Sequence, residues 1–481
     1  MNRMQRLISG VAVLAVAAGS CVLALALPHS EPISVAAERV VSSSEPITIV
    51  CSGGLTRTFE SGLDVTDVNE DVSVDSWVLG TADTVGGAAP AVTFAGDDVT
   101  TAGPLAFEAS TGALEGVVTT QAGENTEHTL LAGGTLHVAS DGDLRGTAMN
   151  PCQSASMDQW LVGSQSGVGT SNEILLANPG LTPVTVRLAA YGSVGRLDLG
   201  SYSQVTVAAQ TSQRVSLDGI VESDSRIAVH VTTDSGAVAA SMQEITLDGA
   251  RAAGVSFVTP GDSGTDLIIP GVNATDGETA SLEAPTLRIV NPGSEPATVD
   301  VYTRDDDEEE ELAGGQGLTV APGTVLDLSL AGLSPGFHSL RLSSSSEIAA
   351  GVELHRQSGD TAPRDIAWAA ARPGQETGAV VTGPLHGALV VTPTTPGEVT
   401  VTATPIDADG SLLDEITATV PDASTASLSL PEGAVAVVFR ADAPVAAAAV
   451  TQSTVTDGSA IDWIAPFAPD SQVLTRRVAV Q

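Results

Sequence analysis

Acidic side chains are the most abundant groups in this sequence that could do chemistry. The 481 residues include 58 Asp and Glu but only 19 basic residues, all of them Arg. Asp407, Asp409 and Asp414 lie close together around Gly410, much as calcium loops place carboxylates around a glycine turn. We predict a plain Asp-Gly hairpin turn here, with a calcium site as the alternative. The contiguous acids Asp305–Glu311 are more typical of a solvated loop tip than of a metal site.

Other catalytic and metal-binding motifs are missing. Without lysine the chain has no phosphate-binding Walker A loop and no Schiff-base nucleophile. The seven His are scattered, with no H-E-x-x-H and no C-x-x-C, so we predict no metal and no cofactor. The run Gly163–Gly167 has Gln165 where a serine hydrolase motif has its serine. We therefore predict a non-enzymatic protein, although two carboxylates far apart in sequence could still meet in a hydrolase site.

Two cysteines lie beyond the first 30 residues, Cys51 and Cys152. An even pair in an exported chain suggests a disulfide. Closing a loop of about 100 residues stabilises a fold by up to about 4–5 kcal/mol in the chain-entropy model. The alternative is two unpaired buried thiols.

We expect a recurring hairpin to form the framework that positions the acidic and cysteine side chains. It reads ILLANPGLTPVTV at Ile174–Val186 and LRIVNPGSEPATVDV at Leu287–Val301, with a third, altered copy at Leu389–Val401. Proline fixes φ and glycine accepts positive φ, so Asn-Pro-Gly predicts a tight turn between two strands. We predict that the turn residues define the fold, with a ligand-cradling loop as the alternative; they are Asn178, Pro179, Gly180, Asn291, Pro292 and Gly293.

Four aromatic residues at intervals of about 100 residues form a second repeating marker. Each closes an apolar strand that Pro or Gly soon follows: Trp160, Phe257, Trp368 and Trp463. Such residues pack a core more often than they form a ligand platform. We therefore expect them to be core residues of a structural repeat.

Short alternating strands, small residues and this period predict an all-β protein of tandem Ig-like β-sandwich modules. A β-propeller is the alternative architecture. The predicted units are a signal or anchor helix, a linker, an N-terminal β module and three sandwich repeats, the second with the acidic insertion; they span 1–27, 28–48, 49–150, 151–262, 263–373 and 374–481.

Residues 7–27 are uncharged and follow Arg3 and Arg6. Their length and flanking charge predict a single membrane-spanning helix with the N-terminus in the cytoplasm. A signal peptide cleaved after Ala24-Leu25-Ala26 is the alternative, and it would leave a secreted protein.

The runs Trp160–Gly163, Ile174–Gly180, Val184–Val186 and Ala237–Ser241, with Cys152 upstream, resemble an uncharacterised family. Its members are exported, membrane-anchored β-repeat proteins of high-GC Gram-positive (actinobacterial) bacteria. The resemblance is good over 150–300 and weaker beyond. The family has no assigned activity, so the resemblance implies only the fold and the location.

The formal net charge is −39, which argues against binding nucleic acid. We expect a membrane-tethered, extracytoplasmic scaffold or interaction protein of the cell envelope, with envelope proteins or wall polymer as partners. A module that binds cell-wall polysaccharide is the first alternative. A carboxylate-dependent hydrolase is the second.

Overall fold

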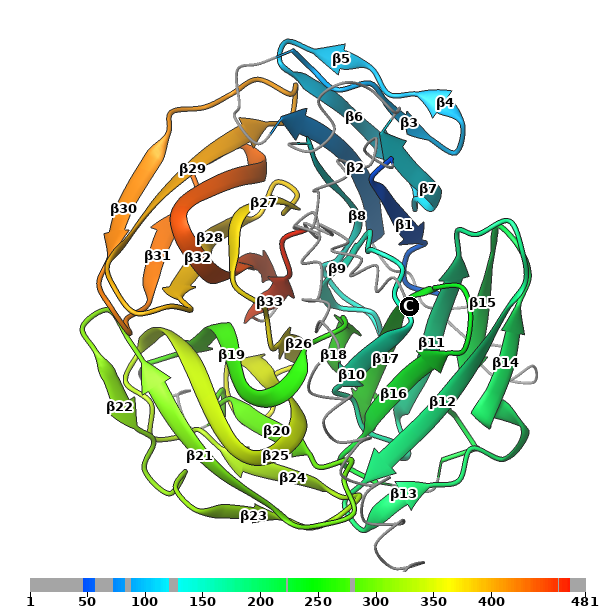
Figure 1. The fold of residues 1–481 in the computed structure, drawn as a ribbon, viewed down its shortest axis with the longest axis vertical. Coiled ribbons are helices and arrows are strands. Elements are labelled where there is room, and N and C mark those ends of the chain that lie inside the picture. The colour runs from blue at the N-terminus through cyan, green and yellow to red at the C-terminus, as the bar shows by residue number, and fades with distance from the viewer. Residues whose placement is uncertain are drawn as a thin grey trace, which may run out of the picture. The chain divides into compact units, whose positions relative to one another are not determined.

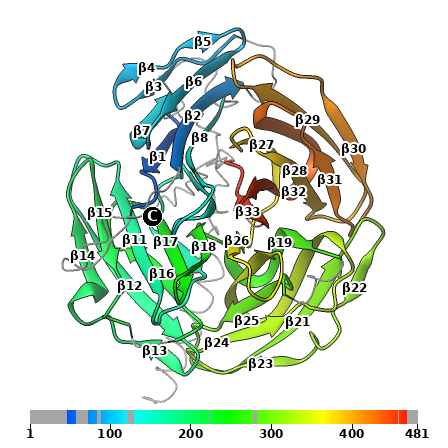
Figure 2. The ribbon, with the colours of Figure 1, turned by 180° about the vertical axis from the view of Figure 1, so that it is seen from behind.

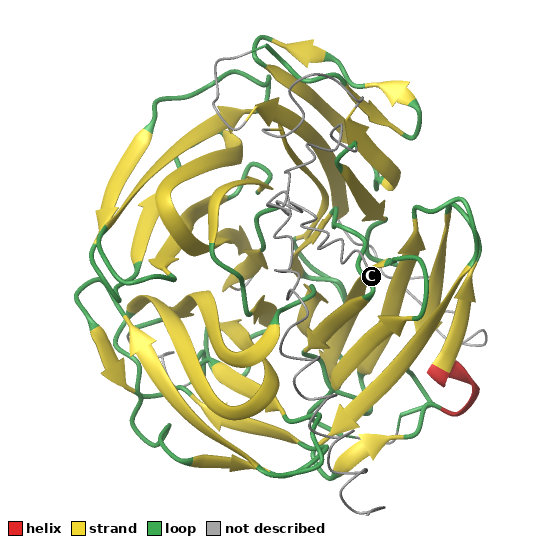
Figure 3. Ribbon diagram, in the orientation of Figure 1, coloured by secondary structure: helices red, strands yellow, loops and turns green. Residues whose placement is uncertain are grey.

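The computed structural model describes residues 46–56, 72–82, 88–120, 129–221, 224–276, 282–456 and 458–467. All of them belong to one compact unit. Among the described residues, the regular structure is β-strand apart from one short 3-10 helix, η2 (Gly200–Ser203), as Figure 3 shows. The predicted all-β fold is therefore confirmed.

Within the described ranges, no helix has the length and apolar character needed to cross a membrane. The predicted span 7–27 lies outside these residues, as does most of the predicted linker 28–48.

The strands form four consecutive groups, which we call repeats 1 to 4. Repeat 1 contains β1 (Thr48–Ser52), β2 (Val72–Ala82), β3 (Val92–Phe94), β4 (Asp97–Asp98), β5 (Thr101–Ala102), β6 (Leu105–Thr111), β7 (Glu115–Thr120), β8 (Thr129–Ala139) and β9 (Gly146–Pro151). Repeat 2 contains β10 (Asp158–Val162), β11 (Thr170–Asn178), β12 (Val184–Gly192), β13 (Gly195–Leu197), β14 (Gln204–Val207), β15 (Thr211–Ser216), β16 (Ala228–Thr233), β17 (Ala239–Asp248) and β18 (Arg251–Val258).

Repeats 3 and 4 follow the same plan with fewer, longer strands. Repeat 3 contains β19 (Ser263–Ala274), β20 (Thr286–Val290), β21 (Ala297–Arg304), β22 (Glu309–Glu311), β23 (Leu318–Val320), β24 (Val325–Ser329), β25 (Gly336–Gln357) and β26 (Arg364–Ala370). Repeat 4 contains β27 (Gln375–Val381), β28 (His386–Pro393), β29 (Val399–Asp407), β30 (Ile416–Val420), β31 (Ala426–Ser429), β32 (Ala434–Val455) and β33 (Gly458–Ile464). The predicted boundaries after 262 and 373 fall between these groups.

Each repeat is built from antiparallel strands that pair in a recurring order. In repeat 2 the two sheets are β10-β16-β12-β13, with β14 also on β12, and β15-β11-β17-β18. One apolar cluster joins them, with Leu161 and Val186 from the first sheet and Ile174 and Met242 from the second. Strand β12 alternates buried and exposed side chains over its first five residues, as the period-2 pattern of the sequence predicts.

In repeats 3 and 4 a single long strand runs through both halves. The first part of β25 pairs mainly with β19 and β21, and its second part pairs with β20 and β26. Strand β32 does the same with β27 and β29 and then with β28 and β33. In repeat 2 two separate strands replace the long strand: β16 corresponds to its first part and β17 to its second part.

The last strands of the four repeats lie together at the centre of the unit. Contacts link β9 to β18, β18 to β26, β26 to β33 and β33 to β9, and Figure 1 shows them surrounded by the outer strands. Figure 2 shows the same arrangement from behind. This propeller-like arrangement is compatible with the β-propeller alternative.

Separate Ig-like sandwiches in tandem, the first architectural prediction, are not what the structure shows. The apolar clusters cross from one repeat to the next. One cluster combines Trp77 and Leu136 of repeat 1 with Val381 and Phe439 of repeat 4, and another joins repeats 3 and 4. A sequence period gives the length of a repeat, but it cannot say which outer faces the neighbouring repeat will cover.

Candidate functional site

A polar cleft lies between repeats 2 and 3. It consists of two adjoining hollows with volumes of about 360 and 150 Å³, and both are lined by Asp248, Ala253 and Arg364. The larger hollow is also lined by Gln165, Ser166, Gly167, Val168, Thr170, Ser225, Thr246 and Leu247, and the smaller one by Arg251, Ala252, Gln357 and Ala362. The larger hollow is within the size range of small-molecule sites.

Two glycines let the elements around the cleft approach each other. Gly254 in β18 has φ +133°, and a Cβ there would lie 2.5 Å from a side-chain carbon of Ile366 in β26. Gly169, just before β11, has φ +89°, and a Cβ there would overlap the carbonyl oxygen of Leu247. Other residues would be strained at these positions. The glycines thus place β18 against β26 and the loop 163–169 against β17.

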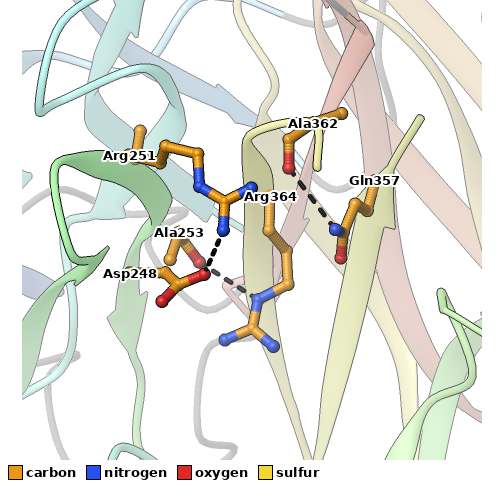
Figure 4. A pocket seen from close by; sticks show the side chains of 7 residues that line it. Asp248, Arg251, Ala253, Gln357, Ala362 and Arg364 are labelled. Carbon is orange, nitrogen blue, oxygen red and sulfur yellow. Dashed lines mark hydrogen bonds and ion pairs between the residues drawn. The ribbon is translucent and has the colours of Figure 1, made fainter. Parts of the chain in front are cut away.

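Arginines from both repeats reach the cleft (Figure 4). The Nη2 of Arg251 lies 2.6 Å from Oδ2 of Asp248, and its Nη1 donates to the carbonyl of Thr361 at 2.8 Å. The Nε of Arg364 donates to the carbonyl of Ala253 at 3.3 Å. These bonds connect the two repeats and hold both guanidinium groups at the cleft.

Two buried carboxylates lie in the same interface. Burial raises the pKa of Glu244 in β17 to about 7, and the charge of Glu353 adds to the effect. The acid accepts hydrogen bonds from Nε1 of Trp368 at 2.8 Å and Oγ1 of Thr246 at 3.2 Å. Burial also acts to raise the pKa of Glu353, but nearby positive groups, first His355 at 3.1 Å, lower it to about 2.

Opposed pKa values in neighbouring carboxylates are typical of acid–base pairs. Here neither Glu244 nor Glu353 lines the cleft, and Glu244 is fully buried. A bound molecule would meet arginine, hydroxyl and amide groups instead. The arrangement therefore offers contacts for binding.

Arg288 in β20 connects the repeats behind the cleft. Its Nε and Nη2 each lie 2.9 Å from an oxygen of Asp327, and it also donates to the carbonyls of Ser164 and Ser225 in repeat 2. The guanidinium carbon lies 4.9 Å from the ring centre of Trp368. A buried arginine with this set of partners fixes the relative position of the two repeats.

Two more buried acids, Asp365 in β26 and Asp462 in β33, lie at the centre of the unit. Asp365 accepts hydrogen bonds from the backbone N–H groups of Thr147 in β9, Val255 in β18 and Ile461 in β33, at 3.4, 3.3 and 3.0 Å. One side chain thus connects the central strands of all four repeats. Burial raises the pKa of Asp365 to about 7 and raises that of Asp462 well above its usual value.

The sequence-predicted calcium candidates lie at a turn. Oδ1 of Asp407 accepts hydrogen bonds from the N–H groups of Asp409 and Ser411 at 3.0 and 2.8 Å. Gly410 has φ +78°. No group of three or more potential metal-binding side chains occurs in the described ranges. Asp407 therefore serves the backbone of its own turn.

The first part of the acidic run, residues 305–308, forms the turn between β21 and β22, and Glu309–Glu311 form β22 itself. Asp305 accepts hydrogen bonds from the N–H groups of Asp307 and Glu308. Glu309 lies 2.7 Å from Arg304 and 2.8 Å from Arg341, while the neighbouring acids Asp306, Asp307, Glu308, Glu310 and Glu311 are exposed.

The predicted turn asparagines are buried and bonded to the backbone. Nδ2 of Asn178 donates to the carbonyls of Thr182, Val207 and Ala208, and its Oδ1 accepts from the N–H of Gly180. Asn291 makes equivalent bonds with Glu295, Val320 and Gly293 in repeat 3. The prolines Pro179 and Pro292 lie within these turns. The predicted hairpin is wrong, however: β11 and β12 belong to different sheets, and β20 and β21 each pair with β25 but not with each other. Gly180 and Gly293 do not have the expected positive φ, because the asparagine side chain holds each turn.

All four marker aromatics are buried, but they do not occupy equivalent places. Phe257, Trp368 and Trp463 lie in the last strands β18, β26 and β33, whereas Trp160 lies in β10, the first strand of repeat 2. Trp160 stacks on His230 with ring centres 4.2 Å apart. The apparent interval from Trp160 to Phe257 is thus not a structural repeat.

The predicted disulfide between Cys51 and Cys152 is present. It joins β1, the first strand of repeat 1, to the residue that follows β9. The two ends of this repeat are therefore covalently connected.

Sequence reasoning missed Glu244, Asp365, Asp462 and the two arginines of the cleft. Asp462 had one visible signal, since it is the single charge of the apolar strand β33, and charges in such places are seldom solvated. Glu244 and Asp365 had less, because Asp248 lies in the same strand as the first and Arg364 precedes the second. The arginines had none, because the cleft forms only when two repeats meet.

A family model matches residues 106–431, which is more than half of the chain, and its description is "Family of unknown function (DUF5719)". The match runs from β6 through all of repeats 2 and 3 to the end of β31. No curated protein matches the chain.

Proposed function

The chain belongs to the DUF5719 family of unknown function, and we propose that it is a non-enzymatic interaction protein of the bacterial cell envelope. In this proposal residues 7–27 anchor it in the membrane and the β repeats lie outside the cytoplasm. We propose that each repeat is derived from an Ig-like sandwich and that the family is actinobacterial.

The non-enzymatic proposal rests on one observation: the buried carboxylates accept hydrogen bonds from neighbouring strands. Glu244 accepts from Trp368 and Thr246, and Asp365 accepts backbone N–H groups of three other strands. The acids with the most perturbed environments thus hold the repeats together. They are not presented at the cleft, where a substrate would meet them.

The disulfide supports location outside the cytoplasm, because such bonds persist in oxidising compartments. The acidic surface supports partners other than polyanions.

The proposal is tested with the full chain in cells. We expect it in the membrane fraction, with Cys51 and Cys152 resistant to thiol labelling until a reductant is added. Cross-linking in intact cells, followed by purification, should recover a defined envelope protein. A variant that lacks residues 1–27 is the control for membrane retention. Recovery in the cytoplasm with free thiols would contradict the proposal.

Binding of wall polysaccharide is the second candidate. The polar lining of the cleft, with Gln165, Thr170 and Arg364, is the observation that favours it. Purified wall polymer should then compete with the protein partner or be recovered in its place.

A further inference from the structure

The cleft between repeats 2 and 3 has the features of a ligand site, beyond the protein–protein role proposed above. We propose that it binds a hydrophilic molecule through a carboxylate or phosphate group, with Arg364 as the main contact of the anion. This inference does not depend on the proposed envelope function.

The orientation of Arg364 is the first argument. Its Nε is bonded to the carbonyl of Ala253, and Figure 4 shows its two terminal nitrogens with no bond to the other residues drawn. Arg364 lines both hollows. No hydrogen bond or ion pair within the described part of the chain engages these nitrogens. A planar pair of N–H donors that is held by its Nε matches the two oxygens of a carboxylate or phosphate.

The second argument compares Arg364 with other arginines of the chain, which are paired with carboxylates. Arg187, Arg288 and Arg341 each have a carboxylate within hydrogen-bond distance. In a chain with 58 acids against 19 bases, such pairing is expected. Among the residues that the structure describes, Arg364 has no such partner within 4 Å, although its charge contributes to the lowered pKa of Glu353, which already contacts His355.

The other lining groups define the ligand class. Asp248, the single acid among the described lining residues, is engaged by Arg251, so the charge balance of these residues favours an anion over a cation. The larger hollow adds hydroxyl and amide groups from Gln165, Ser166, Thr170 and Ser225, and its described lining contains no aromatic side chain. A small polyhydroxylated anion, such as a sugar acid or a polyol phosphate, meets these groups best.

The experiment measures binding to the purified full chain by calorimetry and by thermal shift. The probes are glucuronate, inorganic phosphate and glucose, where glucose is the neutral analogue of glucuronate. We expect saturable binding of glucuronate or phosphate that weakens as salt is added, and at least tenfold weaker binding of glucose. The stronger anion identifies the carboxylate or the phosphate source.

Substitutions of Arg364 test whether this residue contacts the anion. Arg364→Gln should lower the affinity at least tenfold, and Arg364→Lys should recover part of it. Arg187→Gln changes the net charge equally at an exposed site away from the cleft, so it should bind like the wild type. If Arg364→Gln does not fold, Arg364→Lys and Arg251→Gln provide the comparison.

Three results would overturn the inference. They are no saturable binding of either anion to the wild type, equal affinity for glucose and glucuronate, and unchanged affinity in the folded Arg364 variants. None of them affects the envelope proposal, whose readouts are location and cross-linked partner.

Discussion

Single polar residues inside this protein act mainly as acceptors and donors for the backbone. Asn178 and Asn291 satisfy the carbonyls around their turns, and Asp365 satisfies N–H groups of three neighbouring strands. Buried backbone groups without partners are costly. These side chains therefore make tight turns and a crowded centre possible.

Replacement of the turn asparagine should destabilise repeat 2. Asn178→Ala removes the donor to three carbonyls, and we expect a loss of about 1–3 kcal/mol in the free energy of unfolding. Urea unfolding followed by circular dichroism measures it. Thr185→Ala, at an exposed position of β12, is the control and should change stability little. An equal effect of both variants would contradict this role.

Glu244 should make stability depend on pH. Its folded-state pKa is raised to about 7 from 4.5, so it destabilises the fold as pH rises through that window. From ~pH 5 to ~pH 7.5 this one group removes about 2 kcal/mol. Glu244→Gln cannot ionise and should show a correspondingly smaller fall.

The difference between the pH profiles of wild type and Glu244→Gln isolates the contribution of Glu244, because the other titrating groups are present in both proteins. His137, whose burial lowers its pKa to about 4, acts in the opposite direction, because stability is lost as pH falls from 6.5 to about 4. It is present in both proteins, as are Asp365 and Asp462. Parallel profiles for wild type and Glu244→Gln would show that Glu244 is not the titrating group.

At the scale of elements, close approach of strands from different repeats is the main constraint. Strand β18 can reach β26 only because Gly254 has no side chain. We expect Gly254→Ala to cost about 1–3 kcal/mol through overpacking and backbone strain. Gly264→Ala in β19 is the matched control, since the nearest atom to a Cβ there, Cδ2 of Leu267, would lie 3.7 Å away. Thermal unfolding should separate the two variants clearly, and similar melting temperatures would argue against the tight contact.

The disulfide fixes the first strand of repeat 1 beside the last. The cysteines are 101 residues apart, and removal of such a bond typically costs about 2–5 kcal/mol. The double variant Cys51→Ser and Cys152→Ser should therefore melt at a lower temperature than the oxidised wild type. The reduced wild type should melt near the double variant. If reduction leaves the melting temperature unchanged, the bond contributes little to stability.

The whole unit should unfold as one body, because its apolar clusters extend across repeat boundaries. We expect a single calorimetric transition with equal calorimetric and van't Hoff enthalpies. A chain that ends at residue 373 loses the cover on Trp77 and Leu136, and should become less stable throughout. Four resolved transitions, or a truncated chain with unchanged stability of repeats 1 to 3, would instead indicate independent modules.

The sequence determined the local structure well, for physical reasons that act over a few residues. The Asn-Pro-Gly turns and the alternating strands follow from local side-chain chemistry and side-chain period. The predicted pairing across these turns was wrong, because β11 and β12 belong to different sheets. The cysteine count and the predicted export pointed to the disulfide. The Asp-Gly turn at Asp407 likewise needed only its neighbours in the chain. The solvated acidic tip was predicted only in part, because Glu309 pairs with Arg304 and with the distant Arg341.

Only the tertiary structure decided how the repeats meet. Whether Glu244, Asp365 and Asp462 are buried depends on strands that lie far away in sequence, and so does the placement of Arg251 and Arg364 on one cleft. The same apolar pattern suits serial sandwiches or a propeller-like ring, because both bury one face of each strand. The choice between them rests on contacts such as Gly254 with Ile366, whose geometry no local pattern contains.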